Sequence, residues 1–82
     1  WMMDKRATAI GKNLQGVDLS GANLLGIKLS NANLRGAILT EVNLTGASML
    51  WTDLSGANLV SANLVGANLV GIVLNEAKLN NA

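Results

Sequence analysis

The sequence contains no cysteine, no histidine and no proline. The absence of cysteine excludes disulfide bonds, and the sequence therefore gives no information on whether the protein works in an oxidising or a reducing compartment. Without histidine or cysteine, the chain lacks the commonest general base, the thiol nucleophile and the soft metal ligands. The absence of proline is consistent with a backbone whose N–H groups all take part in hydrogen-bonded ladders. A length of 82 residues limits the chain to one domain.

Aromatic residues and charge are also scarce. Tyrosine and phenylalanine are absent, and six basic residues nearly balance five acidic ones, for a net charge of +1. The basic residues are scattered and have no aromatic platform beside them, so we expect no nucleic-acid partner. The chain has no apolar run long enough to span a membrane and does not begin like a signal peptide. The expected location is therefore the cytoplasm.

The acidic residues give no sign of catalysis. No two of them stand at a spacing that must bring them together, and Asp18 and Asp53 occupy a repeated position where Asn is usual. We predict that the protein is not an enzyme and holds no metal and no cofactor. The five acidic residues are Asp4, Asp18, Glu41, Asp53 and Glu76.

What the sequence does contain is an apolar residue at every fifth position. Five residues of an α-helix turn through about 500°, which spreads such residues around the helix. Along a straight strand, an odd period sends alternate residues to opposite faces. The chain must therefore turn a corner once per repeat, with these centres inside. The predicted core comprises Leu14, Leu19, Leu24, Leu29, Leu34, Leu39, Leu44, Met49, Leu54, Leu59, Leu64, Leu69, Leu74 and Leu79.

The other positions of the repeat have preferences of their own. Alanine stands two residues before the centre in eight of fourteen repeats, where a small inward side chain allows close packing. Asn or Asp directly precedes the centre in nine repeats, and such side chains bond to nearby backbone groups. Glycine stands two residues after the centre in eight repeats and suits a corner.

This pattern resembles the pentapeptide-repeat family, whose repeat is written A(N/D)LxG. Residues 22–26, 57–61 and 67–71 are clear examples, and the resemblance covers residues 12 to 81. It implies an all-β protein, a right-handed quadrilateral β-helix of about three and a half coils. Four repeats to a coil is what the family implies, because no twenty-residue period stands out in the sequence.

The resemblance divides the chain into residues 1–11, an N-terminal cap or linker, and residues 12–82, the β-helix. Asp4 is suited to cap a short helix through Ile10, with Gly11 as its end. The alternative is a frayed tail. In the first case Trp1, Met2, Met3 and Ile10 would close the core. The last repeat has no cap, so we expect a piece of a longer chain and self-association through the coil ends.

A stretch with little charge is the best candidate for a functional surface. Between Val42 and Asn75 the only charged residue is Asp53. Several outward positions there are apolar, which reflects either the strand preference of β-branched residues or a contact surface. We interpret them as a protein interface, because low charge and apolar outward positions coincide. The candidate residues are Leu50, Trp51, Val60, Val65, Val70 and Val73.

The repeat at residues 47–51 departs from the pattern. Met49 replaces the central leucine and Trp51 replaces the corner glycine. This predicts either a local bulge in the coil or an exposed aromatic anchor for a partner. Thr52, at an inward position of the next repeat, adds to the impression of a disturbed coil.

The function predicted from these features is a non-enzymatic structural or protein-interaction module, a segment or small subunit of something larger. The alternative is a regulator that inhibits or protects a partner enzyme. Some family members protect DNA gyrase by mimicking DNA, but that needs a dense negative surface which a net charge of +1 does not provide. The family is frequent in cyanobacteria, in the cytoplasm and the thylakoid lumen, so a bacterial source and a thylakoid location are consistent with the resemblance.

Overall fold

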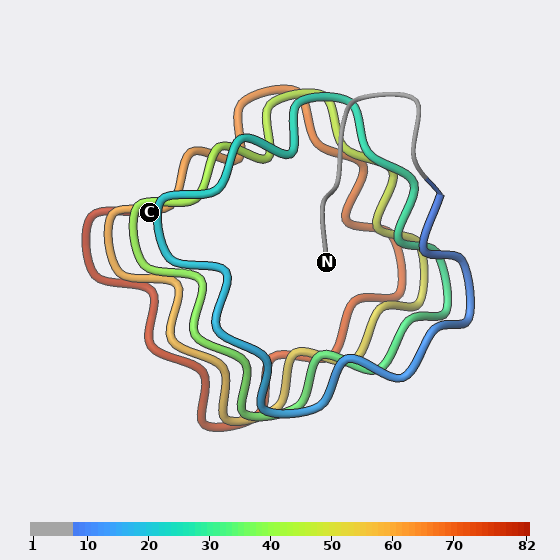
Figure 1. Cartoon of the computed structure of the whole chain (residues 1–82), viewed down its shortest axis with the longest axis horizontal. Coiled ribbons are helices and arrows are strands. Elements are labelled where there is room, and N and C mark those ends of the chain that lie inside the picture. Colours follow the sequence, from blue (N-terminus) through green and yellow to red (C-terminus); the bar gives the residue numbers. More distant parts are fainter. Residues whose placement is uncertain (1–7) are drawn as a thin grey trace.

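The chain winds into a coil whose turns are held together by parallel bridges. The structure is a computed structural model, and it describes residues 8–82. Each bridge joins residues twenty apart, from Thr8 with Lys28 to Asn58 with Lys78. Twenty residues are four repeats, so each coil has four sides, and successive coils stack along a common axis (Figure 1). The pairing is by isolated bridges, and residues 8–82 contain no helix and no longer strand.

Four faces follow from this register, and each is named here after one of its central residues. The Leu34 face contains the repeats centred on Leu14, Leu34, Leu54 and Leu74. The Leu39 face contains those of Leu19, Leu39, Leu59 and Leu79. The Leu44 face contains those of Leu24, Leu44 and Leu64, and the Leu29 face those of Ala9, Leu29, Met49 and Leu69. The Leu39 and Leu29 faces lie on opposite sides of the coil.

Each corner is a type II turn that begins at the central residue. The N–H three residues after the centre donates to the central carbonyl, as Ala37 N does to Leu34 O at 3.0 Å. The residue two after the centre has a positive φ, as a type II turn requires. Nine of these corner residues are glycine. The other six adopt the same left-handed conformation at a steric cost. They are Asn31, Glu41, Trp51, Ser61, Glu76 and Asn81.

In each repeat, one backbone N–H takes no part in the ladders or the turn. Where Asn or Asp precedes the centre, its side chain accepts a hydrogen bond from this N–H. In the repeat 32–36, two N–H groups donate to the next coil, one donates to the preceding coil and one closes the preceding turn. The fifth, that of Arg35, donates to Asn33 Oδ1 at 3.0 Å. All nine Asn and Asp residues before a centre accept such a bond, at 3.0 to 3.3 Å. The sequence preference for Asn and Asp thus has a local, structural cause.

The central residues form the core, but they are not equivalent. Leu14, Leu19, Leu64, Leu69 and Leu74 are only partly buried, and Leu79 is 41% exposed. The sequence analysis placed all fourteen centres inside, but those of the outer coils are less buried because these coils have a neighbouring coil on one side only. The leucine and methionine centres that are 0–1% exposed are Leu24, Leu29, Leu34, Leu39, Leu44, Met49, Leu54 and Leu59.

The unusual repeat at residues 47–51 does not disturb the coil. Met49 is fully buried at a central position, and Trp51 N donates to Val70 O at 2.9 Å in the ordinary ladder. Thr52 is also fully buried, and its hydroxyl donates to Leu29 O at 2.8 Å. The predicted bulge is therefore wrong: methionine fits a leucine position, and the buried hydroxyl has a partner.

The first described residues continue the coil and form no helix. Thr8 bridges with Lys28, and Ala9 is buried at a central position. Ile10 is 57% exposed, so it points outward and does not close the core. The predicted helix is thus wrong at residues 8–10. The rest of the predicted cap, with Trp1, Met2 and Met3, lies outside the described residues.

Position in the stack should decide what a central leucine contributes to stability. Leu44→Ala is expected to lower the free energy of unfolding by about 2–5 kcal/mol, because it opens a cavity between two coils. Leu79→Ala removes the same atoms from a site that is 41% exposed and should cost much less. Urea unfolding followed by circular dichroism measures both variants. Equal losses would contradict the difference in burial.

The bond from an Asn side chain to the leftover N–H can be tested at Asn58. Asn58 Oδ1 accepts the N–H of Val60 at 3.1 Å. Asn58→Ala removes this acceptor and should cost about 1 kcal/mol of unfolding free energy. Asn58→Asp keeps an acceptor oxygen, as Asp18 and Asp53 do, and should be nearly neutral at pH 7. Thermal melts of the two variants compare them directly, and an aspartate as damaging as the alanine would refute the role of this bond.

Candidate functional site

Charged side chains are few in residues 8–82. Residues 8–82 contain no group of three or more acidic, histidine or cysteine side chains that would hold a metal ion. Asp53 forms an ion pair with Arg35 at 3.1 Å. Bonds from the Ser55 hydroxyl and the Ser55 N–H, with a smaller effect of Arg35, lower the pKa of Asp53. Ser20 lowers the pKa of Asp18 in the same way. These carboxylates stay ionised and act as local acceptors.

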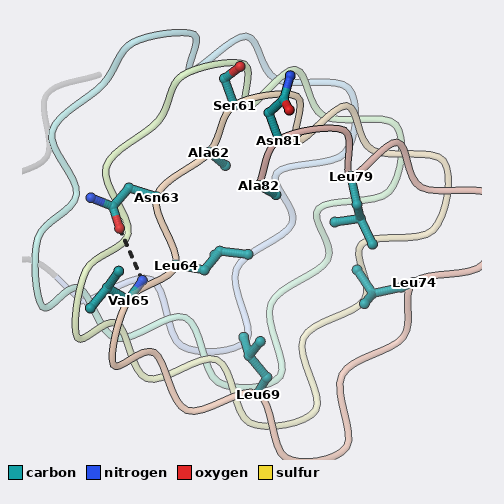
Figure 2. Close-up of a pocket in the computed structure, with 10 residues that line it drawn as sticks. All are labelled: Ser61, Ala62, Asn63, Leu64, Val65, Leu69, Leu74, Leu79, Asn81 and Ala82. Atoms are coloured by element: carbon teal, nitrogen blue, oxygen red, sulfur yellow. Dashed lines mark hydrogen bonds between the residues drawn. The ribbon is translucent and has the colours of Figure 1, made fainter.

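Two hollows lie on the described part of the molecule. The larger has a volume of about 750 Å³ and opens on the last coil, where Leu64, Leu69, Leu74 and Leu79 line it (Figure 2). None of its lining side chains is titratable. The smaller has a volume of about 260 Å³ and lies beside Arg35 and Glu76 on the Leu34 face. Ser55 also lines the smaller hollow, and its hydroxyl donates to Asp53 Oδ1 at 2.6 Å.

Four of the six predicted interface residues come together at one corner. We call Leu50, Trp51, Val70 and Val73 the corner patch, at the edge between the Leu29 and Leu34 faces. Trp51 bonds to the backbone of Val70, and Val73 bridges with Asp53, two residues after Trp51. Trp51 is 62% exposed, Val70 58% and Val73 37%, while Leu50 is half-buried.

The remaining two predicted residues lie on other faces. Val65 is on the Leu44 face and is 69% exposed. Val60 is half-buried on the Leu39 face, across the coil from Val70. The six residues therefore do not form one surface, although all of them point outward from the core.

The indole of Trp51 lies against the backbone of Gly71 in the next coil. A Cβ placed on Gly71 would overlap the six-membered ring of Trp51 at Cδ2, Cε3 and Cζ3. Trp51 itself has φ 60°, a conformation unusual for a bulky residue. The ring thus has one side supported by glycine, while the residue as a whole stays largely exposed. Trp51 and Gly71 are twenty residues apart, and residues at this separation are neighbours in adjacent coils. The contact could therefore be predicted from the sequence only with the coil length in hand.

The repeat model of the family matches nearly all of the described chain. The model for pentapeptide repeats, in eight copies, matches residues 13–50, 26–59 and 52–82. The chain belongs to the pentapeptide-repeat family. The fold of this family is the right-handed quadrilateral β-helix, in agreement with the four-sided coil seen here. No curated protein sequence gave a significant match.

Several solved pentapeptide-repeat proteins are similar to this one. A protein from the Arabidopsis thaliana thylakoid lumen is 32% identical over 90% of this chain and 55% of its own, with a TM-score of 0.73. Rfr23 from the cyanobacterium Cyanothece 51142 is 41% identical over 85% of this chain and 51% of its own, with a TM-score of 0.63. A protein from Nostoc PCC 7120 is 43% identical, covering 84% and 61%, with a TM-score of 0.58. This chain spans about half to three-fifths of their lengths. Residues 8–82 include no helix with the length and apolarity of a membrane crossing.

Gly71→Ala should displace the Trp51 ring. The added methyl group overlaps the indole and also strains a residue with φ 71°. In a Trp1→Phe background, in which Trp51 is the only tryptophan, the fluorescence emission should shift to longer wavelength as the ring leaves its support. Gly36→Ala is the control, because it has the same backbone strain, about 1 kcal/mol, but no atom within 4 Å of its Cβ. Its emission should not change. An unshifted emission in Gly71→Ala would show that the ring does not rest there in solution.

Proposed function

We propose that this chain is a non-enzymatic module that contacts another protein through the corner patch, as a subunit or segment of a larger assembly. The observation that carries the proposal is the exposed Trp51. Its ring lies against Gly71, and the exposed Val70 and Val73 belong to the same corner. Aromatic residues supported by their surroundings are frequent anchors of protein interfaces. At twenty residues to a coil, residues 12–82 give about three and a half coils to carry the patch.

The chemistry of the patch favours an uncharged, apolar partner surface. Its four residues carry no charge, and two of them are more than half exposed. The nearest charges in sequence are those of Asp53, which is paired with Arg35, and of Glu76, three residues after Val73. An exposed apolar cluster beside a neutralised ion pair fits a protein interface better than a site for a charged small molecule. For the location we propose the cytoplasm, with the thylakoid lumen of the Arabidopsis relative as the alternative.

The proposal can be tested by comparing recovery of a partner from native extract. Trp51→Ala removes the aromatic anchor, and Val70→Lys places a charge that must lose its hydration in the interface. Both variants are expected to lose the partner that the unaltered protein recovers. Val60→Lys carries the same substitution on the opposite side of the coil and should retain it.

Circular dichroism melts of the same variants separate binding from folding. The patch residues point outward, so lost recovery with an unchanged melting temperature supports an interface. Unchanged recovery with Trp51→Ala and Val70→Lys would show that these side chains reflect strand preference alone. A lower melting temperature in both variants would assign the patch to the structure.

A further inference from the structure

In five repeats the residue before the centre supplies no acceptor for the N–H that the ladders and the turn do not use. These residues are Lys28, Ile38, Ser48, Val73 and Lys78. The N–H group two positions after each of them has no hydrogen-bond acceptor within residues 8–82. We call these five N–H groups the open donors, and they belong to Ser30, Thr40, Leu50, Asn75 and Asn80.

Two of the open donors border the corner patch. Leu50 is a patch residue and directly precedes Trp51, and Asn75 follows the patch residue Val73 by two positions on the Leu34 face. Ser48 has a hydroxyl group, but this group shares a hydrogen bond with the Ser30 hydroxyl at 3.3 Å and none with Leu50 N. The Trp51 corner therefore has one open donor on each of the two faces that meet there.

A partner that covers the patch must bring acceptors for these donors. In the free protein an open N–H can bond to water, and an apolar contact removes that water. A donor buried without an acceptor costs free energy, which would offset the gain from covering the apolar side chains. The partner's contact surface is therefore apolar with hydrogen-bond acceptors at its edges.

Main-chain carbonyl groups meet this demand better than carboxylates do. Glu76 directly follows Asn75, and it forms no ion pair within residues 8–82. A second negative charge beside it would be repelled. An extended chain presents its carbonyl oxygens together with its apolar side chains, whereas a helix uses the carbonyls internally. The open donors and the patch thus favour the same kind of partner.

We infer that the partner of the corner patch is an extended, uncharged polypeptide segment that crosses the Trp51 corner. Its main-chain carbonyl oxygens accept hydrogen bonds from Leu50 N–H and Asn75 N–H, and its apolar side chains contact Trp51 and Val73. The inference rests on the proposed function, because it takes the corner patch as the contact surface. It adds the chemistry by which that surface selects its partner.

Titration of the ¹⁵N-labelled protein with the peptide acetyl-Val-Thr-Val-Thr-amide tests the inference by NMR. The amide protons of Leu50 and Asn75 should shift to higher frequency as the carbonyl groups bind. In a Trp1→Phe background, the Trp51 indole signal should change with the same dissociation constant. Thr40 and Asn80 are internal controls, because their N–H groups are also open donors but lie on the Leu39 face, across the coil from the Leu29 face. Their signals should not move.

Two substitutions at Ser48 test the Leu50 donor without changing a patch side chain. Ser48→Asn supplies the acceptor that the usual repeat has, so Leu50 N–H becomes occupied and the peptide should bind roughly five- to tenfold more weakly. Ser48→Ala is the matched control. It leaves Leu50 N–H open and should bind the peptide like the unaltered protein. Slower hydrogen exchange of the Leu50 amide in Ser48→Asn than in Ser48→Ala verifies that the asparagine accepts this bond.

The outcomes separate this inference from the proposed function. Equal shifts at Thr40 and Asn80 would overturn the inference, because the peptide would then bind any open donor. Unchanged affinity in Ser48→Asn, or no response of the Leu50 and Asn75 amides, would overturn it as well. If the Trp51 indole responds while those amides do not, the patch is a contact surface without backbone pairing, so the proposed function survives and this inference fails.

Discussion

The structure depends on one constraint, which is that a backbone turning a corner every five residues must still satisfy all of its N–H groups. The ladders between coils and the turn bond satisfy four of the five donors in a regular repeat. The fifth has no backbone partner within reach, and the side chain before the central leucine accepts it. This is why Asn and Asp are frequent there. A positive φ at each corner meets the second demand of the same geometry, and glycine meets it without steric cost.

This hydrogen bonding fixes the positions of the repeats relative to one another, so the outward side chains form a regular grid. Neighbours along a face are twenty residues apart, and neighbours around a coil are five apart. The grid decides which side chains can act together. It places Trp51 against Gly71, brings Val73 to the same corner, and puts Val60 on the far side of the coil, although Val60 is nearer in sequence to Trp51 than Val73 is.

The sequence predicted the family, the inward leucines and the local role of Asn and Asp, because these depend on the five-residue repeat alone. The residues alone did not predict the length of the coil, because no twenty-residue period stands out in them. Four repeats to a coil came from the resemblance to the family. Unequal burial of the leucines was missed because a repeat does not show which coils lie at an end of the stack. The supposed bulge at Met49 was wrong because the ladder involves only the backbone, which methionine leaves unchanged. The grouping of the four residues of the corner patch also depends on the coil length, so the five-residue repeat alone does not show it.

The stability of the fold does not explain why a tryptophan, Trp51, stands at a corner. A non-glycine residue in the left-handed region costs stability, and a bulky side chain is rare there. Glu41 and Glu76 occupy equivalent corners, but their flexible, charged side chains remain in water without loss. Trp51 leaves a large apolar ring in water as well, and its contact with Gly71 covers only part of it. Both costs would disappear with glycine, the usual residue at this position. A residue that weakens the fold twice and is held in a defined place fits selection for contact with something outside the chain.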